Sequence, residues 1–409
     1  MANQTTDNKV IGLSHAPIFF SFFTWGFGTG AQNLGRPLFA FAATGNIFLV
    51  GILLASNAIP RTFTGPLTGF LSDRFGRKPL VILGPTIRGI SNVGQFMIGL
   101  DDYWLFFALE LFGQAGVAMW NTSSNVLLSD VTRTESRARV LAARQMSTRL
   151  GFVAGPAVGG VLAAVFGLQS VFLLNGLSKI VIVLVVFFGV KETRPARMET
   201  SPEKPTRRRL SFYPFKDRTF AVLAIATAAF AMSNAGIMQT LVPVYAIDMI
   251  KVDEAAVGFL ISVASTVTFL FAYPNGIIAD RYGRKRSLVP GLLLLALASF
   301  VLAGWDFYTA LLVAVGIKGL GEAMSLGTTQ TYAMDLAPDH ARGAYIGFWT
   351  FSQALGATLG PILMAGLYYL ISPGAAFITM AIILILAAVL LALFGRETVG
   401  RARIKNEPD

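Results

Sequence analysis

Long apolar runs separated by short polar segments dominate the chain. A run such as residues 181–190 holds no charged side chain and does not alternate between polar and apolar positions. Roughly 20 residues of helix cross the hydrocarbon core of a bilayer, and only helices or closed barrels satisfy the backbone there. Barrel strands alternate, so the pattern predicts an all-α polytopic membrane protein. We expect twelve transmembrane helices, at residues 16–41, 46–72, 78–100, 103–128, 140–166, 169–190, 219–246, 256–279, 287–304, 307–333, 344–370 and 374–395.

A ten-residue motif occurs once in each half of the chain. Residues 69–78 and 276–285 both read G-x3-D-R-x-G-R-K, 207 positions apart. A second segment, Gly151-x3-Gly155-Pro156, returns 205 positions later at residues 356–361. Parallel repeats of this kind are a known architecture of membrane transporters. The chain is therefore predicted to hold two pseudo-symmetric six-helix bundles, at residues 1–190 and 219–409, joined by a linker at 191–218.

The distribution of charge predicts the orientation. Charged residues make up 13% of the chain, against about 25% in a typical soluble domain, and the net charge is +11. Lysine and arginine gather in loops on alternate sides of the spans and in the linker, as the positive-inside rule describes. We therefore expect a multi-pass protein of the cell (cytoplasmic) membrane with both termini and the linker in the cytoplasm. This pattern argues against a nucleic-acid partner. The polar first residues argue against a cleavable leader. The absence of cysteine argues against disulfides.

The motifs carry a resemblance to a known family. The twelve spans and the two copies of G-x3-D-R-x-G-R-K resemble the major facilitator superfamily over essentially the whole chain. The run Gly151-x3-Gly155-Pro156-x2-Gly159-Gly160 is similar to the span-5 signature of the drug:proton antiporter subgroup. The resemblance implies a secondary active transporter that works by alternating access. Its expected activity is multidrug efflux, the proton-coupled export of small amphipathic compounds.

The resemblance also implies a cytoplasmic gating latch in each half. An aspartate at a helix end accepts hydrogen bonds from an arginine or from a helix N-terminus, and glycine permits a tight turn. A basic loop that only fixes the orientation is the alternative. The latch residues are Gly69, Asp73, Arg74, Gly76, Arg77 and Asp130 in the first half, and Gly276, Asp280, Arg281, Gly283, Arg284 and Asp335 in the second.

The antiporter-like motif has a physical interpretation of its own. Gly151, Gly155 and Gly159 fall at i, i+4 and i+8, so they form a stripe on one helix face that permits close packing. Pro156 adds a kink because it lacks a backbone donor. Pure packing, with no bearing on the direction of transport, is an equal alternative to a role in exchange.

Ionisable residues within the spans are candidates for a substrate or proton site, because a charge in mid-bilayer usually faces a cavity or a partner. The resemblance implies that spans 1, 4, 7 and 10 line a central cavity. The candidate cavity residues are Asn33, Arg36, Arg61, Glu110, Gln114, Asn234, Lys318, Glu322 and Gln353. Other ionisable residues within spans are Arg88, Arg144, Arg149 and Lys179.

Glu110 and Glu322 are the candidate proton carriers, because burial disfavours a charged carboxylate. Glu322 lies four residues after Lys318, on the same helix face. Protonation would weaken its hold on Lys318 or on a bound cation and so bias which side of the cavity is open. The alternative for each carboxylate is a structural ion pair, between Lys318 and Glu322, or between Glu110 and Arg36 or Arg88.

Two departures from the subgroup bear on the substrate. Span 4 carries Glu110 about where these antiporters carry an arginine, and span 1 has no acidic residue. Arg36, Arg61, Arg88 and Lys318 then give the cavity side a positive balance that argues against cationic drugs. Uptake or exchange of an organic anion, and lipid flipping, are the alternatives to drug export.

The chain shows no signature of an enzyme. It has no nucleotide-binding P-loop and no histidine cluster with metal-ligand spacing. We expect no cofactor and no metal, with a proton gradient as the energy source. The expected partners of the protein, taken as a monomer, are a small-molecule substrate, protons and the lipid bilayer.

Overall fold

The structure is a computed structural model of the 409-residue chain. It describes residues 16–130, 132, 137–190, 214, 217–338 and 341–398. The side chains of residues 61, 62, 65, 66, 69, 70, 73, 129, 130 and 137–139 lie outside this description. Most of the predicted linker at 191–218 also lies outside it.

Within the described ranges the chain folds into helices and no strand. The helices are α1 (Ala16–Thr44), α2 (Ile47–Ser56), α3 (Ala58–Phe75), α4 (Arg77–Met97), α5 (Tyr103–Asp130), α6 (Arg137–Phe166), α7 (Gln169–Gly189), α8 (Arg218–Met232), η3 (Ser233–Leu241), α9 (Val242–Asp248), α10 (Glu254–Tyr282), α11 (Arg284–Gly304), α12 (Tyr308–Leu336), α13 (Arg342–Leu370) and α14 (Pro373–Phe394).

These helices make twelve crossings of the bundle, because α2 and α3 form one crossing and α8, η3 and α9 form another. The predicted fold class is confirmed, and the predicted spans agree with the helices to within a few residues. The spans predicted at 16–41 and 374–395, for example, are Ala16–Thr44 and Pro373–Phe394.

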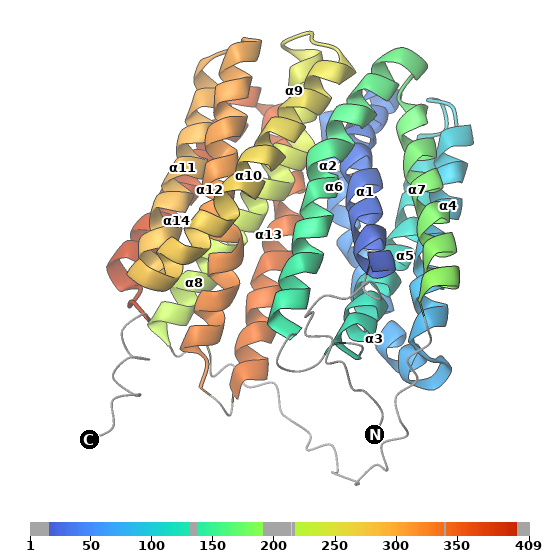
Figure 1. The fold of residues 1–409 in the computed structure, drawn as a ribbon. Helices are drawn as coiled ribbons and strands as arrows, with labels where there is room; N and C mark the ends of the chain where they lie inside the picture. The colour runs from blue at the N-terminus through green and yellow to red at the C-terminus, as the bar shows by residue number, and fades with distance from the viewer. Residues whose placement is uncertain are drawn as a thin grey trace, which may run out of the picture.

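The two halves repeat the same pattern of helix packing. In the first half α1 packs on α6, and α4 packs on α5 and α7. In the second half the equivalent pairs recur, because α8 packs on α13, and α11 packs on α12 and α14. Figure 1 shows α1–α7 on one side of the bundle and α8–α14 on the other, with α6, α10 and α13 near the middle. The duplication read from the motifs is therefore present in the packing.

The seventh crossing departs from a regular α-helix. Residues 233–241 form a π-helical segment, η3, between α8 and α9. Pro243, at the start of α9, has no N–H to donate to the carbonyl one turn earlier. Thr240 donates its hydroxyl to the carbonyl of Ala235 at 2.8 Å, which helps to satisfy the widened turn. Such π-segments often mark functional positions, and Asn234 lies in this one.

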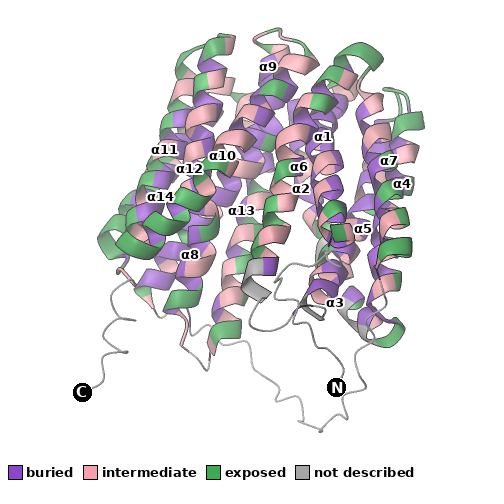
Figure 2. Ribbon diagram, in the orientation of Figure 1, coloured by how far each residue is buried: buried purple, intermediate pink, exposed green. Residues whose placement is uncertain are grey.

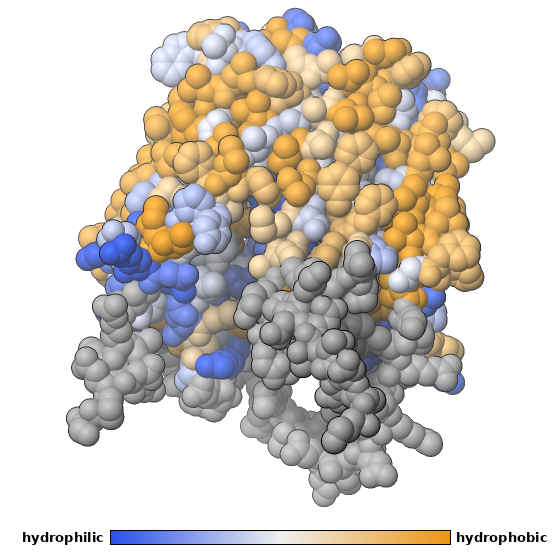
Figure 3. All heavy atoms as spheres, in the orientation of Figure 1, coloured by the Kyte–Doolittle hydropathy of each residue, from blue (hydrophilic) through white to orange (hydrophobic). Residues whose placement is uncertain are grey.

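The outer surface suits a bilayer. Seven of the described helices are long and apolar enough to cross a membrane by length and composition, among them Pro373–Phe394 with a mean hydropathy of 3.1. Large apolar side chains are exposed on the outside, such as Phe188 and Leu370, whereas buried positions lie along the inner helix faces (Figure 2). Figure 3 shows hydrophobic residues over much of the middle of one face. The chain is thus a polytopic membrane protein.

The two halves touch closely at one end of the bundle. A Cβ built on Gly160 of α6 would lie 2.5 Å from the carbonyl oxygen of Glu254, and one on Gly258 of α10 would lie 2.3 Å from that of Pro156. A Cβ on Gly51 of α2 would meet the Pro361 carbonyl of α13 at 2.6 Å. This end is the one away from the start of α1 and the end of α14 (Figure 1). It is closed by contacts between backbones.

Candidate functional site

A cavity of about 830 Å³ lies between the two halves. Its walls come from α1, α5 and α6 of the first half and from η3, α10, α12, α13 and the start of α11 of the second. It extends as far as Arg284 and Asp280, whose side chain is 69% exposed at the end where α1 begins. The cavity is therefore open at that end and closed at the opposite one.

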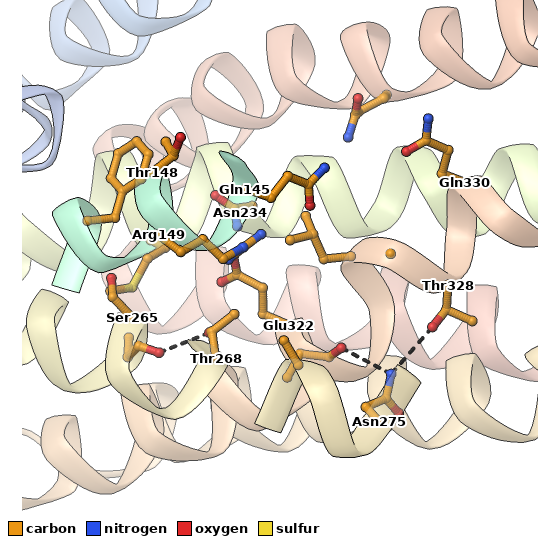
Figure 4. Close-up of a pocket in the computed structure, with 18 of the residues that line it drawn as sticks. Gln145, Thr148, Arg149, Asn234, Ser265, Thr268, Asn275, Glu322, Thr328 and Gln330 are labelled. Atoms are coloured by element: carbon orange, nitrogen blue, oxygen red, sulfur yellow. Dashed lines mark hydrogen bonds between the residues drawn. The ribbon is translucent and has the colours of Figure 1, made fainter. Parts of the chain in front are cut away.

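Glu322 is the acidic group in the depth of the cavity. Lys318, one turn earlier on α12, pairs with its carboxylate. Asn234 of η3 lies near Glu322 and accepts a hydrogen bond from Gln239 at 2.9 Å. Arg149 of α6 faces Glu322 from the other half of the protein (Figure 4). The carboxylate thus stands at the contact between the two halves.

The wall contributed by α6 is cationic. Arg144 and Arg149 both line the cavity. Arg144 donates to the amide oxygen of Asn125 and stacks over the ring of Phe22, 5.2 Å from its centroid. In the part of the chain that the structure describes, no carboxylate lies within ion-pair distance of either arginine. The buried Nε of Arg144 has no hydrogen-bond partner there.

Aromatic side chains form part of the first-half wall. Trp25 of α1 stacks on Trp120 of α5 with 5.0 Å between ring centroids, and Phe22 tilts against Trp120 at 5.3 Å. Behind them Lys179 of α7 is buried, with its ammonium 4.1 Å from the centroid of Trp25. Trp25 and Trp120 are only 6% and 1% exposed, so their stack belongs to the packed core behind the wall; the part-exposed aromatic side chains of the lining are Phe152 of α6 and Trp349 of α13.

Glu110 lies elsewhere, in a buried polar network inside the first half. Its carboxylate accepts hydrogen bonds from Arg36 and Arg88 at 3.0 Å each and from Gln95 at 3.0 Å. Gln114 donates to it at 2.6 Å. Glu110, Arg88 and Gln114 are at most 2% exposed.

This placement differs from the prediction that Arg36, Glu110 and Gln114 line the cavity. The face of α5 that carries Glu110 is turned toward α4 and α1, where Arg88 and Arg36 neutralise it. The structural ion pair, the alternative raised for Glu110, describes its position. The second half has no such network at the equivalent site, since 205 positions on, Glu110 corresponds to the buried Val315.

The second copy of the repeated motif forms a polar cluster at the open end. Arg284 donates to Asp335 at 3.0 Å and also pairs with Asp280. Gly283 has a φ of 119°, and Gly76 in the first copy has a φ of 97°, so both turns need glycine. By contrast, a Cβ on Gly276 would meet nothing within 4 Å, so no close helix approach requires that glycine.

The first copy of the motif is described only in part. Arg77 is buried and donates to the hydroxyl of Ser72 at 3.0 Å. The exposed Arg74 and Arg281 each lie over the aromatic ring that follows in sequence. The side chains of Gly69, Asp73, Asp130 and the cavity candidate Arg61 lie outside the described residues. The cluster at Arg284 stays within one half, and the latch remains a prediction.

The glycine stripe of α6 packs against α1 of the same half. A Cβ on Gly151 would lie 2.3 Å from the Phe23 carbonyl, and one on Gly155 would lie 2.2 Å from the Phe27 carbonyl. Gly159 would meet Ala31 at 2.8 Å. Packing alone explains the stripe, whereas the neighbouring Pro156 and Gly160 touch α10 of the other half.

The structure brings five of the predicted residues to the cavity wall and adds others that the sequence did not single out. Asn33, Asn234, Lys318, Glu322 and Gln353 line it. Arg149 is the important addition; it was visible as a charge within a span, but it lies in span 5 rather than in one of the four expected spans. Other added polar residues include Gln145, Thr148, Thr268, Asn275, Thr328 and Gln330, which Figure 4 labels.

Comparisons with known proteins place the chain in a family. The model of the Major Facilitator Superfamily matches residues 18–253 and 223–409. The uncharacterized MFS-type transporter YfkF of Bacillus subtilis is 30% identical over 352 residues, which cover 84% of this chain and 83% of that protein. The class B tetracycline resistance protein of Escherichia coli is 26% identical over 78% of each chain. A crystal structure of a D-xylose-proton symporter has a TM-score of 0.77 and 16% identity, covering 94% of this chain and 98% of the other.

A twelve-crossing helical bundle with a central cavity defines a polytopic transporter. The chain belongs to the major facilitator superfamily, whose members are transporters rather than enzymes.

Proposed function

We propose that this chain is a proton-coupled secondary transporter of small amphipathic compounds, with Glu322 as the group that carries the proton. One observation carries the proposal. Glu322 lines the central cavity, pairs with Lys318 of its own half and faces Arg149 of the other half. A carboxylate in that position responds to protons and to substrate alike, and its charge acts between the two halves.

The packing supports alternating access. The cavity is open at the end where α1 begins, and the contacts of Gly160, Gly258 and Gly51 close the other end. We propose that the open end faces the cytoplasm, as the positive-inside pattern indicates. Because interfaces of this kind hold one of two packings rather than a continuum, opening the far end requires these glycine contacts to separate while the halves close around the cavity.

The proton supplies a bias between the two arrangements. Charged Glu322 attracts Arg149 across the cavity and neutralises Lys318. Protonation removes that attraction and leaves both cations uncompensated, so it changes the relative free energy of the open and closed forms. A ligand that contacts these cations acts on the same equilibrium.

Two directions of transport have support. Export of drugs is supported by the relatives that are named as tetracycline and multidrug resistance proteins. Uptake or exchange of an organic anion is supported by Arg144 and Arg149 of the cavity wall, which have no carboxylate within ion-pair distance among the described residues. The glycine stripe of α6 supports neither direction, because packing against α1 accounts for it.

Flux measurements in proteoliposomes test the proposal. An imposed pH gradient should drive accumulation of a labelled compound that binds the purified protein, and the first panel includes tetracycline. Glu322→Gln should still exchange labelled for unlabelled compound but should lose gradient-driven accumulation. Flux that ignores the gradient in the unmodified protein would remove proton coupling from the account.

A further inference from the structure

We infer that the cavity is a binding site for an aromatic organic anion, held by Arg149 and Lys318, and that such a ligand and the proton move together. The inference rests on the proposed role of Glu322. Its first observation is the charge of the cavity wall. The described lining residues include four cationic side chains, Arg144, Arg149, Arg284 and Lys318, against two carboxylates, Asp280 and Glu322.

The positive excess lies on the wall that α6 contributes. Arg284 is paired with Asp280 and Asp335 near the mouth, and Lys318 is paired with Glu322. Arg144 and Arg149 have no carboxylate within ion-pair distance among the described residues. A charge held in a membrane interior is costly unless it has a partner, so an anion that enters this cavity completes the site, whereas a cation is repelled.

The shape of the charged group follows from the donors. A guanidinium presents a planar fork that matches a carboxylate, sulfonate or phosphate oxygen pair, and Arg149 reaches into the cavity beside Glu322 (Figure 4). Phe152 of α6 and Trp349 of α13 line the same cavity and are part-exposed, so they offer an aromatic surface. Together these residues fit a ligand with an anionic head and a flat aromatic body.

The sign of the coupling follows from competition for the same cations. The charged groups that face Glu322 are Lys318 from α12 and Arg149 from α6, with polar Asn234 from η3. A ligand anion that takes Lys318 and Arg149 displaces the Glu322 carboxylate, which is then stabilised by taking up a proton. Proton and anion therefore strengthen each other's binding, which is cotransport. A cationic ligand would instead compete with the proton, which is exchange.

Three matched naphthalene probes separate these cases. Naphthalene-1-sulfonate is permanently anionic, naphthalene-1-sulfonamide is neutral and (1-naphthylmethyl)trimethylammonium is permanently cationic, so none of their charges depends on pH in the neutral range. Isothermal titration calorimetry on the full-length protein in detergent should give the sulfonate at least tenfold tighter binding than the other two. Equal affinity for all three, or preference for the cation, would overturn the anion site.

Arginine variants test the residues. Arg149→Gln should weaken sulfonate binding by about tenfold to a hundredfold, the range for a lost charged hydrogen bond, and should leave sulfonamide binding unchanged. The sulfonate affinity of Arg149→Lys should lie between those of Arg149→Gln and the unmodified protein, because lysine keeps the positive charge but lacks the planar pair of donors. Arg286→Gln, which removes an exposed arginine outside the cavity, is the matched control. If Arg149→Gln binds neither the sulfonate nor the sulfonamide, the variant is misfolded and Arg149→Lys decides instead. A sulfonate affinity of Arg149→Lys equal to that of the unmodified protein would overturn the role of the planar guanidinium.

The pH dependence tests the coupling. Sulfonate affinity should rise as the pH falls, and Glu322→Gln should bind the sulfonate tightly at every pH. A sulfonate affinity that does not change with pH in the unmodified protein would overturn the joint binding of proton and anion. If a cationic or neutral compound binds and is still driven by the pH gradient, the anion site fails but proton-coupled transport stands. If the sulfonate binds through Arg149 but no pH gradient drives its transport, the anion site stands and proton-coupled transport fails.

Discussion

At the scale of single residues, two glutamates within membrane-spanning helices have different environments, since Glu110 is buried and Glu322 is partly exposed to the cavity. Glu322 has one cation on its own helix and another across a cavity. Glu110 is enclosed by two arginines and two amides within one half. The pairing of Glu322 with Lys318 was predictable because it depends on four residues of spacing in one helix. The setting of Glu110 was not, because it depends on which face of α5 turns toward α4 and α1.

Glu110→Gln should therefore destabilise the protein without abolishing proton coupling specifically. Removing one partner of a buried ion pair costs about 3–5 kcal/mol, since it leaves buried charge uncompensated. Thermal unfolding in detergent should show a clearly lower midpoint for Glu110→Gln than for Glu322→Gln. Adding Arg88→Leu should recover part of the loss, because it removes one of the two arginines that Glu110 neutralises. A Glu110→Gln protein of unchanged stability that loses gradient-driven flux would make Glu110 the proton carrier instead.

At the scale of helices, glycine decides where backbones meet. Gly155 of α6 lies against the carbonyl of Phe27 in α1, whereas Gly276 of α10 has open space around its missing Cβ. The spacing of the stripe predicted close packing, but it did not say which helix is the partner. That choice depends on the arrangement of the whole bundle. The same holds for Arg149, whose helix was not among those expected to line the cavity.

Gly155→Ala and Gly276→Ala should have opposite effects on stability. In Gly155→Ala the new methyl group would clash with the α1 backbone, and overpacking of this kind typically costs about 1–3 kcal/mol. In Gly276→Ala nothing is displaced, and alanine gains about 0.5–1 kcal/mol of helix propensity over glycine. Thermal unfolding of the two variants in the same detergent makes the comparison. Equal destabilisation by both substitutions would contradict the packing described for α6.

At the scale of the whole molecule, the sequence predicted the fold but not the conformational state, in which one end of the cavity is open and the other closed. The apolar runs fixed twelve crossings, and the repeated motifs fixed the two halves, because both are local patterns with known lengths. Which end of the cavity is open depends on contacts between halves, such as Gly160 with Gly258, that lie far apart in sequence. A network such as that of Glu110, whose equivalent position in the second half is Val315, is likewise invisible to an alignment of the repeats.

Ligand binding should narrow the open end. The chain contains no cysteine, so spin labels at Phe75→Cys and Arg286→Cys report the distance between the halves at that end without background. Both native side chains are exposed. Saturating ligand should shift the distance distribution measured by double electron–electron resonance toward shorter values by several ångströms. A distribution that does not respond to any bound compound would argue against closure of the halves around the cavity.

Proton movement coupled to substrate entry tests the central claim most directly. Proteoliposomes loaded with the pH dye pyranine receive, from outside, a compound of the panel that binds the protein. We expect the lumen pH to change with compound entry, becoming more acidic for naphthalene-1-sulfonate, and to stay constant in Glu322→Gln even though that variant still exchanges labelled compound. Proton movement that persists in Glu322→Gln, or substrate entry without any change of lumen pH in the unmodified protein, would contradict the account.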